Sequence, residues 1–289
     1  MIIYNPKNWF ALIFQFRKAD TARRLAPAIL AIAAYTAVVT WIDEHYLHAP
    51  LLNTTSIHSL VGIVISLVLV FRTNSAYDRW WEGRKLWGQL VNTSRTLAMS
   101  WHARVEDEQS RRRIRVLLAA FPYSLKEHLR NSRDLGPESR DVQEIIGAES
   151  IHAHLPNALV SALTEEVYTA RQRGLIDGYD AILFQPMLTM LSDINGACER
   201  IKNTPIPYSY NIFIKKVIFI FSLTFPFAVV ASFSYWSVPI TVFVFYALAS
   251  LEMIAEEVED PFGTDENDLP TEVLSDRIRA NVHTLFRQQ

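Results

Sequence analysis

The chain has 289 residues, of which 50% are hydrophobic and 20% are charged, and its 28 Lys and Arg residues nearly balance 30 Asp and Glu residues. This composition excludes a disordered chain and a collagen-like fibre, and a net charge of −2 provides no overall field for attracting nucleic acid. The single cysteine, Cys198, excludes an intramolecular disulfide and a cysteine-based metal centre.

The first two segments of the chain are typical of a protein that meets a membrane. Residues 1–24 place aromatic side chains beside Arg17 and Lys18, which predicts a helix at the membrane interface, with a plain cytosolic lead-in as the alternative. Residues 25–42 carry no charged side chain and are long enough to cross a hydrocarbon core of roughly 30 Å. We therefore expect a first transmembrane helix here.

Three further apolar segments follow. The second, residues 57–71, places Ser59, Gly62 and Ser66 on one helical stripe, where small residues allow close helix packing. The third and fourth, residues 217–235 and 238–251, are separated by a very short link and predict a second transmembrane hairpin.

The basic residues predict the orientation of these helices. They are concentrated before residue 25 and after residue 71, and Lys215 and Lys216 precede the third segment, whereas the connection 43–56 has none. Because Lys and Arg favour the cytoplasmic side, we expect four crossings with both termini in the cytoplasm. The predicted parts are an interfacial N-terminal segment, a first hairpin, a cytosolic helical domain, a second hairpin and an acidic cytosolic tail: 1–24, 25–71, 72–211, 212–251 and 252–289.

The middle of the chain has the composition of a soluble helical domain. One predicted helix buries Val105, Ile114, Leu117, Leu118 and Phe121 on one side and carries Arg111, Arg112, Arg113 and Arg115 on the other. A solvated face or salt bridges explain these arginines better than nucleic-acid binding does, because the net charge is close to zero. We therefore expect no nucleic-acid partner.

Residues that carry chemistry are sparse. His152 and His154 are better explained as surface histidines than as metal ligands, because no nearby residue completes a set. Residues 256–268 are rich in carboxylates, which favours a solvated acidic segment over a cation site. No nucleophile stands with a base, so we do not expect an enzyme.

Three motifs, in this order along the chain, carry a resemblance to a known family: Phe71–Arg84 after the second helix, Ile206–Tyr210 before the third, and Asp260–Gly263 after the fourth. Together with the four-helix layout, they resemble a bacterial bestrophin homologue over almost the whole chain. The resemblance implies an all-α polytopic protein of the bacterial inner membrane that assembles as a homopentameric ion channel.

The resemblance also implies that the second helix lines the pore and that Ile63, Leu67 and Phe71 form its neck. The residues alone allow this, because side chains four apart stack along one helix face and a ring of them can gate by dewetting, although the same face could instead meet lipid or another helix. Ser59 and Ser66 flank the neck and favour the pore interpretation.

Two further sites are implied by the resemblance. Ile182 matches an aliphatic residue that forms a second, cytosolic constriction. Asp265 and Asp268 match carboxylate ligands of the calcium clasp of animal bestrophins, and Asp260 lies near a backbone ligand position. Thr264 and Asn267 replace acids of that clasp, so a bound calcium or other divalent cation remains open and no cofactor is required.

The predicted function is passive ion conduction, with the chain itself, the bilayer and permeant inorganic ions as partners. Animal bestrophins pass anions and the family includes cation-conducting members. The neck carries no Lys or Arg, and four acids near the inner side would concentrate cations if they faced the conduit, which favours sodium over chloride. These acids are Glu252, Glu256, Glu257 and Glu259. The alternative is a membrane-anchored scaffold without conduction, whose activity would not change in Leu67→Ala.

Overall fold

The computed structural model describes residues 20–47, 55–132, 136–147 and 154–287, and throughout these ranges the regular structure is helical. The chain forms two compact units. The apolar unit takes its described residues from Ile2–Arg79 and Pro205–Glu259, and the charged unit takes them from Trp80–Thr204 and Asp260–Gln289. A single helix, α3 (Thr55–Arg104), contributes to both units.

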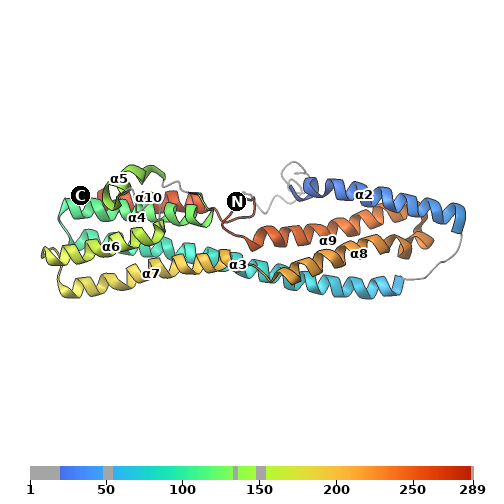
Figure 1. Ribbon diagram of the computed structural model, residues 1–289, viewed down its shortest axis with the longest axis horizontal. Helices are drawn as coiled ribbons and strands as arrows, with labels where there is room; N and C mark the ends of the chain where they lie inside the picture. Colours follow the sequence, from blue (N-terminus) through green and yellow to red (C-terminus); the bar gives the residue numbers. More distant parts are fainter. Residues whose placement is uncertain (1–19, 48–54, 133–135, 148–153, 288–289) are drawn as a thin grey trace. The chain divides into compact units, whose positions relative to one another are not determined.

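The apolar unit consists of α2 (Asp20–Ile42), the first part of α3, α8 (Tyr208–Phe233) and α9 (Ser237–Glu259). A short turn, Ser234–Trp236, joins α8 to α9, and these two helices pack with α2 (Figure 1). Among the described residues, three helical stretches are long and apolar enough to cross a membrane: Thr21–Tyr46, Thr55–Arg104 and Tyr208–Glu259. The last of these contains both α8 and α9.

Several hydroxyl groups inside the apolar unit have hydrogen-bond partners on another helix. Thr40 Oγ1 on α2 lies 2.8 Å from Ser237 Oγ at the start of α9, and Tyr35 Oη donates to the carbonyl of Leu223 at 3.0 Å. Such pairs suit a lipid-facing bundle, because a hydroxyl without a partner in hydrocarbon is costly.

The second predicted helix does not end near residue 71. It continues as α3 to Arg104, because no proline interrupts the sequence between Thr55 and that residue. The third and fourth predicted helices are present as α8 and α9. The chain enters α8 through Pro207 in an extended conformation, with a ψ of 130°.

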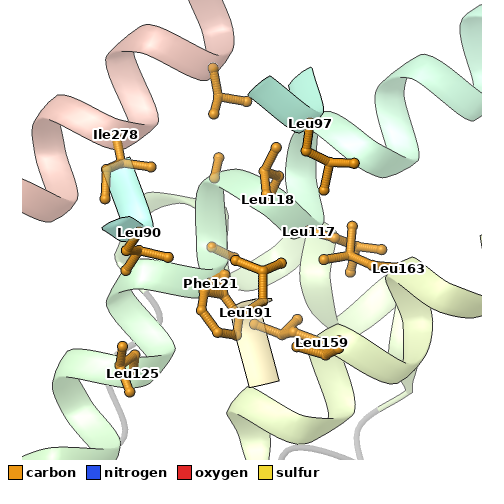
Figure 2. Close-up of a cluster of buried hydrophobic side chains, with 14 of the residues drawn as sticks. Leu90, Leu97, Leu117, Leu118, Phe121, Leu125, Leu159, Leu163, Leu191 and Ile278 are labelled. Carbon is orange, nitrogen blue, oxygen red and sulfur yellow. The ribbon is translucent and has the colours of Figure 1, made fainter. Parts of the chain in front are cut away.

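The charged unit is a helical bundle around one hydrophobic core. It contains the rest of α3 with α4 (Glu108–Leu129), α5 (Ser139–Ile146), α6 (Leu155–Gln172), α7 (Gly178–Asn203) and α10 (Thr271–Arg287). Figure 2 shows leucines of α3, α4, α6 and α7 meeting Phe121 and Ile278 in this core. The core fixes the helix ends that carry the polar sites described below.

The arginine run on α4 makes contacts within the charged unit. Its predicted apolar side is buried, but Arg111 is buried as well, so the expectation that this arginine lies on the exposed side is wrong. The Arg111 guanidinium donates to the carbonyls of Val105 and His102, which have no helical partners at the end of α3. Arg112 pairs with Asp141 at 2.9 Å and Arg113 with Glu166 at 3.2 Å.

Candidate functional site

The predicted neck residues lie on an exposed face of α3. Ile63, Leu67 and Phe71 are 68%, 56% and 58% exposed in the single chain. Ile65 and Leu69 on the same helix are buried against Ile214, Ile218 and Phe221 of α8. With 3.6 residues per turn, the neck stripe points roughly 180° away from the buried stripe. The three side chains therefore face away from the core of their own unit.

The small residues beside the neck have different roles. Ser59 and Ser66 are exposed, and their hydroxyls donate to the carbonyls of Thr55 and Gly62, at 2.9 and 2.8 Å. Their oxygens can still accept hydrogen bonds from water. Gly62 instead faces the ring of Phe221 on α8, which a Cβ at this position would meet at 3.8 Å, an ordinary contact distance.

One carboxylate, Glu259, joins the first two sequence motifs to the end of α9. Its Oε2 lies 2.6 Å from Arg72 Nη2, and its Oε1 accepts the Ile206 N–H at 2.6 Å. Its main-chain carbonyl accepts from Arg79 Nε at 3.1 Å. The side chains of Arg72 and Glu259 are only 1% and 9% exposed. Sequence reasoning counted Glu259 among acids facing the conduit and missed this structural role.

The other three acids near the inner side are also paired with basic residues. Lys215 Nζ lies 3.7 Å from Glu252 and 2.9 Å from Glu256. Arg24 Nη1 lies 3.1 Å from Glu257. Because each carboxylate has a cation beside it, the four acids concentrate cations far less than their formal charge indicates. The basis for the expected sodium preference is therefore weakened.

Ile182 is the fifth residue of α7 in the charged unit and is exposed. The helix begins after Asp177 because Asp177 and Asp180 form a capping box, in which each side chain accepts the other's main-chain N–H. Ile182 also lines an open cavity of about 570 Å³ between α6 and α7, together with Tyr168 and Arg171. A role in a constriction stays a prediction.

The acidic segment after α9 is built around Asp268. Its Oδ2 accepts the Asp265 N–H at 2.6 Å, and burial raises the pKa of Asp268 to about 7. A Cβ at Gly263 would lie 2.7 Å from this oxygen, so the close approach of the backbone at Gly263 to Asp268 Oδ2 depends on glycine. Trp80 and Gly83 of the first motif hold the same segment, because Trp80 Nε1 donates to the carbonyl of Asn267 at 3.0 Å and Gly83 leaves room for Phe262 and Leu269.

The carboxylates of the expected clasp differ in exposure. Asp260 and Asp265 are exposed and Asp268 is buried, with its Oδ1 unpartnered among the described residues. Within the described chain these three acids do not bring ligand atoms together as a metal-binding group. Calcium binding stays a prediction, and no step of the function proposed below depends on it.

The charged unit does assemble a group of metal-ligating side chains that sequence reasoning missed. His128 at the end of α4 and His154 before α6 each place Nε2 close to the same oxygen of Glu199 on α7, at 2.8 and 2.5 Å. Burial, and then the neighbouring His154, lower the pKa of His128. Sequence reasoning considered His154 only with His152, which lies outside the described residues. The partners of His154 in the structure, His128 and Glu199, are distant from it in sequence.

Comparison with known proteins agrees with these motifs and with the all-helical architecture. The family model of the bacterial and fungal bestrophin proteins matches residues 1–284. The chain belongs to this family. The predicted resemblance is confirmed, and the three motifs of this bestrophin are the segments that meet at Glu259 and around Asp268.

Relatives and solved structures cover nearly the whole bestrophin chain. A voltage-dependent anion channel-forming protein of Ralstonia nicotianae is 31% identical, over 99% of this chain and 94% of its own length. The protein YneE of Escherichia coli, which has the same descriptive name, is 29% identical over 98% and 93%. The crystal structure of a bacterial bestrophin homologue from Klebsiella pneumoniae matches 90% of this chain and 98% of its own, with 30% identity and a TM-score of 0.84.

Proposed function

We propose that this bestrophin is a subunit of a passive ion channel whose pore is lined by α3 and is narrowest at Ile63, Leu67 and Phe71. The observation that carries the proposal is the exposed apolar stripe on α3, opposite the face that packs on α8. The names of the relatives, which describe channels, support conduction over the anchored scaffold.

One such stripe cannot enclose a pore, so several copies must surround a common axis. Closed cyclic symmetry brings the same residue of every copy to one level and converts the stripe into three stacked rings. The family resemblance supports five copies. It also supports four crossings, with α8 and α9 as a hairpin, both termini in the cytoplasm and residence in the bacterial inner membrane.

The rings would control ions through hydration. A narrow apolar constriction disfavours water, and an ion that must shed its hydration shell is excluded until the rings widen. Ser59 and Ser66 would keep the flank of the neck wet, because their oxygens accept hydrogen bonds from water. The three neck residues and the two flanking serines are all uncharged, so the neck itself attracts neither anions nor cations.

The sign of the permeant ion follows from the relatives rather than from the acids. Their printed names describe anion channels, which supports anions over sodium as the permeant ions. The four acids from which sodium was expected are paired with Arg24, Arg72 and Lys215. The proposal therefore takes anions as the permeant class.

The test is ion flux through liposomes that contain the purified oligomer, under opposed sodium and chloride gradients. We expect a reversal potential displaced toward that of chloride, and a several-fold larger conductance or leak in Leu67→Ala, because a smaller ring lowers the dewetting barrier. Leu30→Ala is the matched control, since Leu30 is an equally apolar, exposed side chain on α2.

Each outcome decides a separate part of the proposal. A reversal potential at that of sodium would refute the anion assignment alone. Equal conductance in the native chain and in Leu67→Ala would refute the assignment of the neck. No flux above that of empty liposomes from a folded oligomer would refute conduction and favour the anchored scaffold.

A further inference from the structure

Three side chains of the charged unit converge on one point. They come from separate elements: His128 from the last turn of α4, His154 from the position before α6, and Glu199 from α7. Their ligand atoms all lie within 4.8 Å of one another, and the two imidazole rings are 4.3 Å apart between centroids. We propose that His128, His154 and Glu199 bind one divalent transition-metal ion of the zinc class.

The distances are close to those that such an ion requires. Zinc binds imidazole nitrogen and carboxylate oxygen at about 2.0–2.2 Å, which places ligands of a tetrahedral site about 3.4 Å apart. In the structure, the two Nε2 atoms lie 2.8 and 2.5 Å from Glu199 Oε1. The oxygen therefore has to withdraw by less than about 1 Å, which the rotatable glutamate side chain allows without movement of α7.

The chemistry of the donor set selects the class of ion. Two imidazoles and one carboxylate suit zinc, cobalt, nickel or copper, whereas calcium and magnesium prefer a set of oxygens alone. The three side chains are 35%, 34% and 27% exposed, so an ion can enter and water can occupy a fourth position. The bound ion would therefore remain accessible to solvent.

Buried neighbours orient these ligands. Asn195 Nδ2 donates to Glu199 Oε1 at 3.3 Å and to Asn157 Oδ1, also at 3.3 Å, and the Asn195 side chain is buried. A hydrogen bond from a neighbouring side chain to a ligating carboxylate holds that carboxylate in place. The site therefore has both a convergent set of ligands and an outer support.

Two local interactions oppose the ion and limit its affinity. The Asn157 N–H donates to His154 Nδ1 at 3.3 Å, and a metal on Nε2 would require a proton on Nδ1, so this N-cap bond is lost. Lys202 Nζ, which donates to the carbonyl of His128, adds a positive charge nearby. We therefore expect binding weaker than that of a structural zinc site, with a metal that exchanges.

The consequence of binding would be a cross-link between three helices. A metal joins the end of α4 to the beginning of α6 and to α7, so it stabilises the charged unit by a free energy that rises with the logarithm of the free-ion concentration once that concentration exceeds Kd. The inference does not depend on ion conduction, because it rests on the geometry within one unit.

The experiment uses the full chain as a purified oligomer in detergent, which is stripped with a chelator, dialysed and then incubated with Zn²⁺ or Co²⁺. We expect about one Zn²⁺ or Co²⁺ per subunit by metal analysis, the visible absorption of four-coordinate Co²⁺, and an unfolding temperature that rises with added Zn²⁺. His128→Asn and Glu199→Gln should each weaken binding at least tenfold.

His283→Asn is the matched control. His283 Nε2 lies 2.9 Å from the buried Glu138 in the same unit, but among the described residues no second histidine joins that pair in a metal-binding group. This variant should bind metal as the native chain does, and metal-free unfolding temperatures show whether each variant is folded. Equal binding by the native chain and by folded Glu199→Gln, or no bound Co²⁺ in the native chain, would overturn the proposal.

Discussion

The buried pair between Arg72 and Glu259 provides the sharpest test of how the apolar unit is held together. In Glu259→Gln, the amide oxygen can still accept the Ile206 N–H, but the negative charge beside Arg72 is removed. Nε and Nη1 of Arg72 are already buried without a hydrogen-bond partner among the described residues. The substitution therefore leaves a buried guanidinium without its counter-ion.

The expected cost is large because both side chains are shielded from water. Removing one member of a buried ion pair costs about 3–5 kcal/mol, whereas an exposed pair contributes about 0–1 kcal/mol. Arg72 and Glu259 are 1% and 9% exposed, so the larger figure applies. The double variant Arg72→Met with Glu259→Gln removes the isolated charge and should recover at least half of the loss.

The assay compares thermal unfolding midpoints of the detergent-solubilised oligomer by intrinsic fluorescence. Glu256→Gln is the control, because it neutralises an exposed carboxylate that pairs with Lys215 on the same helix bundle. If Glu259→Gln unfolds at the same temperature as Glu256→Gln, or if the double variant is less stable than Glu259→Gln, the reasoning is refuted.

Three further predictions concern the acidic segment and the neck. Gly263→Ala should lower the free energy of unfolding by about 1–3 kcal/mol, because the new Cβ would lie 2.7 Å from Asp268 Oδ2. The thermal unfolding midpoint measures this loss. Burial raises the pKa of Asp268 from 3.8 to about 7, so protonation of this carboxyl stabilises the folded protein relative to the unfolded chain. This contribution is fully present below about pH 4 and is lost as the pH rises through 7; Asp268→Asn should lack that part of the pH dependence. Ser66→Ala should reduce single-channel conductance at an unchanged unfolding temperature, because it removes a water-binding oxygen beside the neck.

Each of these has a contrary outcome. Unchanged stability in Gly263→Ala would mean that the segment relaxes away from Asp268. An identical pH profile in Asp268→Asn would assign the loss of stability near pH 7 to other groups. A lower unfolding temperature in Ser66→Ala would indicate that Ser66 supports helix packing rather than hydration.

The apolar helices, and the face that the three expected neck residues share, could be predicted because their signals are local. An uncharged run long enough to span a bilayer predicts a helix wherever it lies, and side chains four apart share a face on any α-helix. Ile63, Leu67 and Phe71 could thus be placed on one stripe before any tertiary contact was known. The three motifs predicted the family in the same way, because residue order alone carries a resemblance.

The polar sites could not be predicted in this way. Glu259 pairs with Arg72 across 187 positions of sequence, and His154 meets Glu199 across 45. Counting charges along the chain led us to treat Glu259 as an unpaired acid. Considering only spacing along the chain led us to group His154 with His152 rather than with His128. Neither error could be corrected by periodicity, because no local pattern encodes which distant groups meet.

The sequence by itself determined the apolar helices, the face shared by Ile63, Leu67 and Phe71, and the bestrophin family, since each depends on the order and period of neighbouring residues. Only the tertiary structure decided that the stripe is exposed, that the four acids lie beside three basic side chains, that one buried carboxylate joins two motifs to the end of α9, and that two histidines and a glutamate converge. The physical reason is that a charge acts through what lies within a few ångströms of it, and folding chooses those neighbours.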